Sequence, residues 1–154
     1  IFPVSVLEDK NIDHLMDAIK GCLPFGPKFY PDDMKSDHSD RFLISELIRE
    51  KILVATKEEI PHSVAVIIDS MKESMEEKDT MEIYATIFVE RDSQKKIIIG
   101  HNGEMIKKIK QFALKDIKKL LDTKVHLDLW VKVKKDWKDR PDDLRALGYS
   151  LDNF

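Results

Sequence analysis

Two of the five glycines in the 154-residue chain stand three positions apart, in the tetrapeptide Gly100-His101-Asn102-Gly103. Glycines at this spacing permit a tight turn and let the backbone of a ligand approach closely. The residues that follow predict a helix, whose first amides lack partners within the helix and attract anions. The tetrapeptide therefore predicts a phosphate-binding turn. An ordinary connection between two helices is the alternative, because a lone pair of glycines is a weak signal.

Lysines surround this turn, although the chain as a whole is slightly acidic. Residues 1–80 carry 10 Lys and Arg against 17 Asp and Glu, whereas residues 81–154 carry 16 against 12. Residues 94–120 hold two acids, Glu104 and Asp116, and the eight lysines Lys95, Lys96, Lys107, Lys108, Lys110, Lys115, Lys118 and Lys119. This local charge of +6 predicts a surface that binds a polyanion. A helix face kept solvated by its lysines is the alternative.

No comparable group of residues predicts catalysis, a metal site or a membrane span. Cys22 is the single cysteine, which indicates a reducing compartment, and the five histidines do not stand at metal-ligand spacing. Hydrophobic residues make up 42% and charged residues 36%, which excludes a disordered and a membrane-embedded chain. We therefore expect a cytoplasmic protein with no catalytic residue and no metal in this chain.

Hydrophobic periodicity predicts the elements that position the turn. Helices are expected over residues 41–59, capped by Ser39 or Asp40 and stopped by Pro61, and over 105–121; strands are expected over 63–71, 81–91 and 125–134. The order of elements predicts an α+β fold, in which a three-stranded sheet carries helices on one face. Trp130 lies among the residues of the last strand, and core or cap packing is favoured for it over base stacking.

The first 40 residues differ from the rest. Residues 1–6 predict a short buried strand, and Asn11 is a good cap for a helix with an apolar stripe from Ile12 to Ile19. One strand and one helix cannot make a core, so residues 1–22 are expected to be the end of a larger α/β domain upstream. Residues 23–40, rich in proline and aspartate, predict an inter-domain linker. On this interpretation the chain is a C-terminal fragment.

The segment IIIGHNGEMIK, residues 97–107, closely resembles the signature of the KH domain, a module that binds single-stranded RNA. The helix-first order of elements resembles its type II form, which implies an α-β-β-α-α-β fold over residues 41–135 and a helical tail over 136–154. In this family the GxxG loop clamps about four nucleotides by their backbone while the bases lie in an apolar groove. The RNA-binding residues implied are Ile99, Gly100, His101, Asn102, Gly103, Met105, Ile106, Lys95, Lys96, Lys107, Lys108 and Lys110.

Further segments resemble the Era family of bacterial GTPases, in which a KH domain follows a GTPase domain. They are LPFGPKFYPDD at 23–33, ELIREKI at 46–52, IPHSVAV at 60–66, IFVERDSQK at 87–95, LWVKVKKDW at 129–137 and LRALGY at 144–149. This resemblance implies that residues 1–22 are the last strand and helix of an α/β P-loop GTPase domain. Ser5 is the one residue carried over to its guanine site, and Val6 replaces the alanine usual beside it.

The Era resemblance implies a factor for assembly and maturation of the small (30S) ribosomal subunit, whose KH domain binds the single-stranded 3′ end of 16S rRNA. It also implies coupling to an upstream domain that uses GTP and Mg²⁺, and peripheral association with the inner face of the cell membrane. The loop GxxxxGK[ST] is absent from these residues, so this chain alone is not expected to hydrolyse GTP. Two alternatives are a protein-interaction module, whose basic helix docks the ribosome or the GTPase domain, and a small nucleotide-phosphate site at residues 100–103.

The loop departs from the family pattern at His101 and Asn102, because a lysine is usual there. An imidazole is only partly charged near pH 7, so attraction for phosphate must come from the helix amides and the neighbouring lysines. We therefore expect RNA affinity to fall between about pH 6 and 8 more steeply than it does for a loop that carries lysine.

Overall fold

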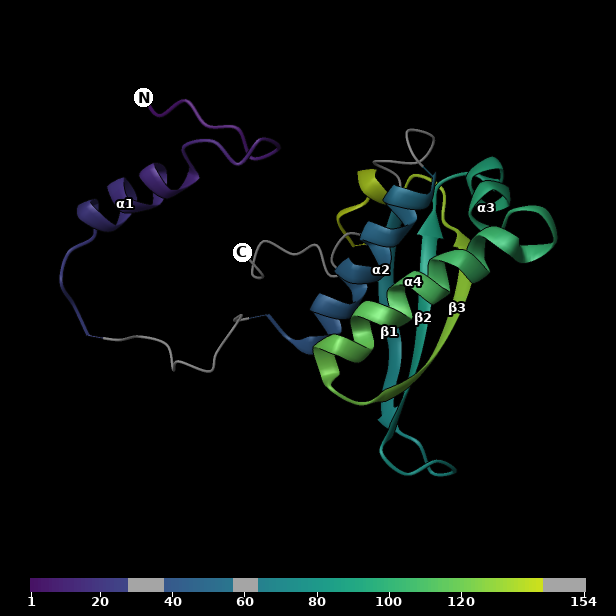
Figure 1. The fold of residues 1–154 in the computed structure, drawn as a ribbon. Coiled ribbons are helices and arrows are strands. Elements are labelled where there is room, and N and C mark those ends of the chain that lie inside the picture. The colour runs from purple at the N-terminus through teal and green to yellow at the C-terminus, as the bar shows by residue number, and fades with distance from the viewer. Residues whose placement is uncertain (28–37, 57–63, 143–154) are drawn as a thin grey trace. The chain divides into compact units, whose positions relative to one another are not determined.

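The structure, a computed structural model, describes residues 1–27, 38–56 and 64–142 (Figure 1). The chain divides into two compact units, residues 1–37 and 38–154, and each is described by itself. Three predictions fall wholly or partly outside the described residues: the helix stop at Pro61, residues 28–33 of the segment that resembles the Era family, and most of the helical tail.

The first unit contains one helix, α1 (Ile12–Cys22), among its described residues. The helix is predicted correctly, but the buried strand expected at residues 1–6 is wrong: Ile1 and Val6 are exposed, and Ser5 makes only an isolated bridge to Lys10. A strand needs a neighbour for its backbone groups, and none of the described residues supplies one. The side-chain cap is also wrong, because Nδ2 of Asn11 donates to the Pro3 carbonyl oxygen at 2.9 Å.

The second unit has the predicted α+β order. Its elements are α2 (Asp40–Thr56), β1 (Val64–Glu73), β2 (Thr80–Val89), α3 (Asp92–Ile99), α4 (Glu104–Leu121) and β3 (Lys124–Val133). A single 3₁₀ turn, His101–Gly103, joins α3 to α4, and another, Trp137–Asp139, follows β3. Ser39 caps α2 as predicted, since its Oγ accepts a hydrogen bond from the Phe42 amide at 3.3 Å.

The three strands form one mixed sheet in the order β1-β2-β3. β1 and β2 are antiparallel, with Val64 opposite Val89, whereas β2 and β3 are parallel, with Val89 opposite Val133. Parallel strands cannot be joined by a tight hairpin and need a crossover connection. α3, the 3₁₀ turn and α4 make that crossover, so the turn lies in the middle of the connection that builds the sheet.

The helices cover one face of the sheet, with α2 and α4 in front of it in Figure 1. The buried residues of each helix recur every four positions and face the strands. The core includes Ile44, Ile48 and Ile52 of α2, Ile109, Ala113 and Ile117 of α4, and Ile83, Ile87 and Leu127 of the sheet. A rigid α/β core thus supports both ends of the crossover.

An ion pair between α2 and α4 makes the stability of this unit pH-dependent. Nζ of Lys51 lies 2.6 Å from Oδ2 of Asp116. The hydrogen bond from Lys51 holds the pKa of Asp116 below its ordinary value, and the bond to Asp116 raises the pKa of Lys51. A lowered carboxyl pKa stabilises the fold above the unfolded-state pKa, and this contribution is lost as the pH falls through the folded-state pKa.

We expect Asp116→Asn to lower the melting temperature at pH 7, and the difference from wild type to shrink as the pH falls below the ordinary range of a carboxyl group. Thermal melts at pH 7 and at a series of acidic pH values measure it. Glu76→Gln, on the β1–β2 turn, is the control, since no ion pair of Glu76 is found within the described residues. A difference from wild type that is equally large at low pH would mean that Asp116 stabilises the fold by something other than its charge.

Candidate nucleic-acid interface

The helix before the turn is well defined at both ends. At its start, Oε1 of Gln94 accepts hydrogen bonds from the amides of Glu90 and Arg91, both at 3.0 Å. At its end, the Gly100 amide donates to the Lys96 carbonyl oxygen at 2.8 Å. These hydrogen bonds at the two ends of α3 therefore fix the direction in which the chain enters the turn.

Three of the four residues in the turn have positive φ: Gly100 at 72°, Asn102 at 49° and Gly103 at 77°. Gly100 combines this φ with a ψ of 179°, a conformation that is almost confined to glycine. A Cβ atom on Gly100 would lie 2.6 Å from Cβ of Met105 and 2.9 Å from its amide nitrogen. Both the backbone conformation and this close approach therefore require glycine at position 100.

The second glycine leaves the start of α4 without a side-chain cap. Gly103 is the residue before the helix, and no side chain there bonds the first-turn amides. Helix dipoles and free amides at such a terminus favour an anion. His101 and Asn102 are exposed, so an anionic chain can approach this end of the helix. The predicted turn and the uncapped helix start thus occur together.

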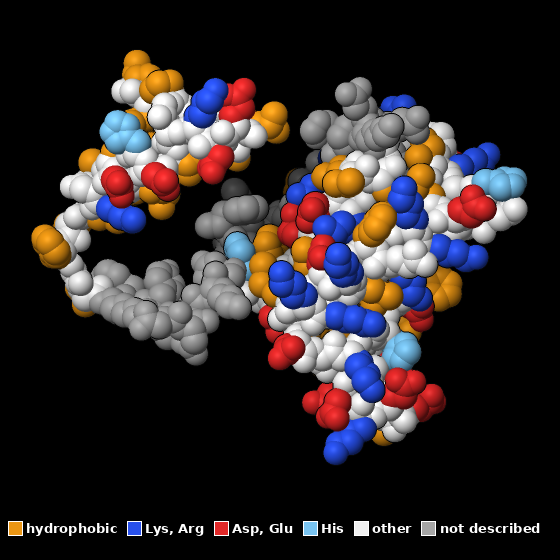
Figure 2. All heavy atoms as spheres, viewed as in Figure 1, with side chains coloured by type: hydrophobic (Ala, Val, Ile, Leu, Met, Phe, Trp, Pro, Cys, Tyr) orange, Lys and Arg blue, Asp and Glu red, His pale blue; other side chains and the backbone are white. Residues whose placement is uncertain are grey.

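The lysines predicted to bind phosphate are not equivalent. Lys96, Lys107 and Lys108 are exposed and Lys95 is half-buried, and no ion pair of these four is found within the described residues. Nζ of Lys110, in contrast, lies 2.9 Å from Oδ1 of Asp128 on β3. Figure 2 shows Lys and Arg side chains spread over the helical face of this unit. Lys110 is therefore already engaged in an ion pair that joins α4 to β3.

The three apolar residues expected at the site connect the turn to the core. Ile99, Met105 and Ile106 are partly buried and pack against the main hydrophobic cluster. Each leaves part of its surface open beside the turn. These residues fix the turn on the core and add apolar surface next to it.

The remaining predicted site residue, Ser5, lies in the first unit. Its hydroxyl accepts a hydrogen bond from the Glu8 amide at 3.3 Å, within a local turn. The assignment of Ser5 to a guanine site stays a prediction.

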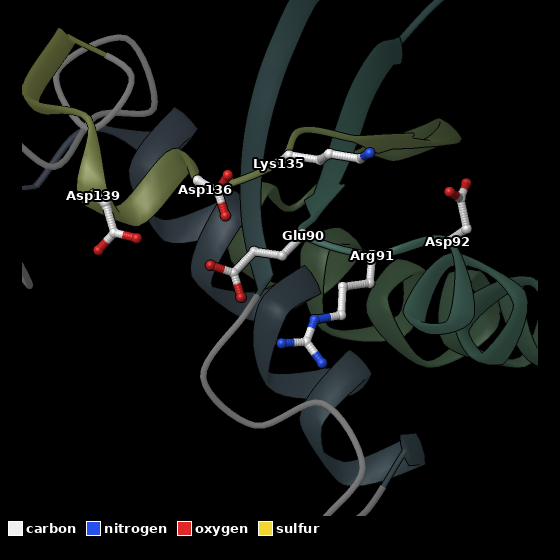
Figure 3. Close-up of a pocket in the computed structure, with 6 residues that line it drawn as sticks. All are labelled: Glu90, Arg91, Asp92, Lys135, Asp136 and Asp139. Carbon is white, nitrogen blue, oxygen red and sulfur yellow. The ribbon is translucent and has the colours of Figure 1, made fainter.

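A hollow of about 420 Å³ beside the start of α3 offers a different chemistry. Four acids and two bases line it: Glu90, Asp92, Asp136, Asp139, Arg91 and Lys135. Figure 3 shows their side chains pointing in different directions rather than toward one point. In the part of the chain that the structure describes, no group of His, Cys, Asp and Glu is arranged to hold a metal ion. The acidic lining disfavours phosphate, so this hollow is not part of the interface.

Residues 59–138 match the KH domain family. The chain belongs to the KH domain family. Two solved structures are similar to the chain: an Aquifex aeolicus Era variant bound to GDP and AlF4⁻, and Era in complex with MgGDPNP and nucleotides 1506–1542 of 16S ribosomal RNA. Both are 39% identical to it over 97% of its length, with TM-scores of 0.90 and 0.91. The chain spans 50% and 49% of those two chains and matches their C-terminal half.

The KH fold here is the type II arrangement predicted from the order of elements. Among the described residues, no helix has the length and apolar character needed to cross a membrane.

The core or cap packing predicted for Trp130 is wrong. Trp130 is 62% exposed, on the face of the sheet away from the helices. The alternation in β3 already contained the signal: Leu129 and Val131 pack in the core, so the residue between them must face outward. Trp137, by contrast, is buried against Ala65.

The two glycines of the loop should differ in their tolerance of alanine. Gly100→Ala meets both a forbidden conformation and the Met105 backbone, so we expect a loss of at least about 3 kcal/mol of unfolding free energy. At Gly103 an added Cβ atom has no neighbour within 4 Å, and only the positive φ is unfavourable for alanine. We therefore expect Gly103→Ala to lower the unfolding free energy by about 1 kcal/mol. Urea denaturation of both variants measures the difference. Equal losses would show that the contact between Gly100 and Met105 does not constrain the turn.

Proposed function

We propose that this KH domain binds single-stranded RNA through the loop Gly100–Gly103, which clamps the sugar-phosphate backbone. The observation that carries the proposal is the exposed turn at an uncapped helix start, flanked by Lys95, Lys96, Lys107 and Lys108. Backbone amides and lysines recognise phosphates without regard to sequence, and base contacts beside the loop add preference. Lys110 contributes less than the other lysines, because Asp128 already compensates its charge.

The RNA that we propose is the single-stranded 3′ end of 16S rRNA, bound during assembly and maturation of the 30S ribosomal subunit. Support comes from the similarity to an Era structure that contains nucleotides 1506–1542 of that RNA. We further propose that RNA binding is coupled to GTP binding and hydrolysis by a GTPase domain upstream of this KH domain. GTP and Mg²⁺ belong to that domain, because the P-loop motif does not occur in these residues.

The proposed location is the cytoplasm, with peripheral association at the inner face of the membrane as in the family that the sequence resembles.

A protein-docking function is the second candidate, and a different surface favours it. An apolar hollow of about 450 Å³ lies between α2 and the end of α4, and Leu43, Leu47, Leu53 and Leu120 contribute its apolar lining. Leu120 is 40% exposed. Leu43, Leu47 and Leu53 are partly exposed, and a hollow lined by leucines suits an apolar partner better than a polyanion. Docking to the ribosome or the GTPase domain would use this surface as well as the basic face of α4.

Negative charge introduced into the loop tests the RNA clamp. We expect His101→Asp/Asn102→Asp to weaken binding of a labelled RNA copying the 16S 3′ end by at least about 10-fold, because two carboxylates then face the phosphates. Fluorescence anisotropy measures the affinity. The control is Val54→Asp/Met75→Asp, which adds the same charge at two exposed positions on α2 and the β1–β2 turn. If both double variants lose affinity equally, the effect is one of net charge and the loop is not the clamp.

The salt dependence of wild-type binding gives the number of phosphates held. A strand contacting about three to five phosphates should give a slope of about −2 to −3.5 in a plot of log affinity against log salt concentration. A free mononucleotide should compete poorly. Strong competition by a mononucleotide would favour a small nucleotide-phosphate site in the same loop.

The imidazole in the loop predicts a pH effect. Protonation adds a positive charge beside the phosphates, so wild-type affinity should be higher at pH 6 than at pH 8. His101→Lys should remove most of this dependence while it raises affinity at pH 8, because lysine stays charged across that range. Titrations at constant ionic strength measure both. A flat wild-type profile, or one unchanged in His101→Lys, would show that His101 does not face the phosphates.

A further inference from the structure

The outer face of the sheet carries an aromatic side chain that the proposed clamp does not use. Trp130 is 62% exposed, whereas Trp137 is 4% exposed. A tryptophan has a large apolar surface, and leaving it in water is unfavourable unless a partner covers it. The exposure of Trp130 leaves a flat aromatic ring open to a binding partner.

Positive charge alternates with this aromatic along β3. Lys132 follows Trp130 by two positions in β3, which places it on the same side of the strand, and Lys134 comes directly after the strand ends at Val133. Nζ of Lys134 lies 5.9 Å from the centroid of the Phe88 ring, and Phe88 pairs in register with Lys132. An aromatic face interleaved with lysines is the arrangement by which proteins stack bases and attract the backbone of a single strand.

The acidic residues on this face already have partners. Oδ1 of Asp128 pairs with Lys110 at 2.9 Å, and Oδ2 of Asp69 accepts a hydrogen bond from Oγ1 of Thr86 at 2.7 Å. Thr86 is the register partner of Trp130 and is buried beneath this surface. The Thr86 hydroxyl is neutral, so Asp69 keeps its charge, whereas Lys110 compensates the charge of Asp128. The exposed Trp130 ring and the neighbouring Lys132 together suit a polyanion that carries flat rings.

Trp130 also lies within reach of the strand that the loop would hold. Lys110 is seven residues after Gly103, about 10 Å along α4, and its pair with Asp128 fastens β3 at that point. Trp130 lies two residues farther along β3, about 7 Å, and β3 runs toward α3 (Figure 1). Because β3 is an edge strand, its outer side chains lie at the rim of the sheet.

We propose that Trp130 stacks on a base of the bound RNA, outside the nucleotides held by the Gly100–Gly103 loop, with Lys132 beside the neighbouring phosphate. This inference rests on the proposed function and extends the RNA path around the β3 edge onto the outer face. The predicted contact is a base on an aromatic ring rather than a phosphate on backbone amides. The two contacts can therefore be separated by the length and the chemistry of the RNA.

The first test compares RNA lengths. Trp130→Ala should weaken binding of a 12-nucleotide copy of the 16S 3′ end by about 5- to 100-fold, and should leave binding of a four-nucleotide RNA unchanged. Trp130→Phe should retain most of the affinity, because phenylalanine also stacks. His126→Ala is the matched control, since His126 is an exposed residue at the other end of the same strand. Far-UV circular dichroism and thermal melts confirm that each variant is folded.

The second test assigns the base. Abasic nucleotides are placed singly along the 12-nucleotide RNA. At one position the missing base should weaken binding to wild type as much as Trp130→Ala does. The same abasic RNA should bind Trp130→Ala no more weakly than the intact RNA does. Equal affinity of wild type and Trp130→Ala for the long RNA would refute the stacking contact and leave the outer face to a protein partner. If His101→Asp/Asn102→Asp still loses affinity in that case, the proposed function survives. Failure of wild type to bind either RNA would overturn the proposed function and this inference together.

Discussion

Parallel pairing between β2 and β3 is the constraint on which the rest of the second unit depends. It places Val133 opposite Val89 and so obliges the chain to cross the sheet between them. The crossover is made of two helices, which must reverse direction in a few residues. Gly100 makes that reversal possible, because its backbone lies where any Cβ atom would meet Met105. The loop proposed to hold RNA is thus the same structure that allows the sheet to form, and its conformation is maintained by the core below it.

The distribution of charge gives this loop its chemistry. The chain carries a net charge of −3, yet the lysines on α3 and the first turns of α4 lie beside an uncapped helix start. Acids concentrate elsewhere, in the β1–β2 turn and in the mixed-charge hollow of Figure 3. Lys110 differs from the neighbouring lysines, because its ion pair with Asp128 joins α4 to the edge strand β3. The charge distribution therefore separates the end of the unit that is proposed to bind RNA from residues that stabilise the fold.

Much of this arrangement was predictable from the sequence, since it depends on local rules. The helix and strand periods, the Ser39 cap and the glycine turn each follow from neighbouring residues. The predictions were wrong or incomplete where the structure of a residue depends on partners far away in the sequence. Residues 1–6 have the composition of a strand but no described neighbour to pair with, and Lys110 finds its carboxylate 18 positions away. Trp130 is a second kind of failure: the alternation of β3 already placed it on the outer face, but the prediction followed the preference of a large aromatic side chain for burial. The assignment of Ser5 and the division into domains stay predictions.

Backbone amide chemical shifts, recorded while the protein is titrated with the 16S 3′-end RNA, would show which residues the RNA contacts. We expect the largest changes at residues 100–107 and at Lys95 and Lys96, with none at the β1–β2 turn around Met75. Changes confined to the apolar hollow around Leu43 and Leu120, or no changes at saturating RNA, would contradict the proposed RNA clamp. In that event the Gly100–Gly103 turn would serve the fold alone, and binding would belong to another surface.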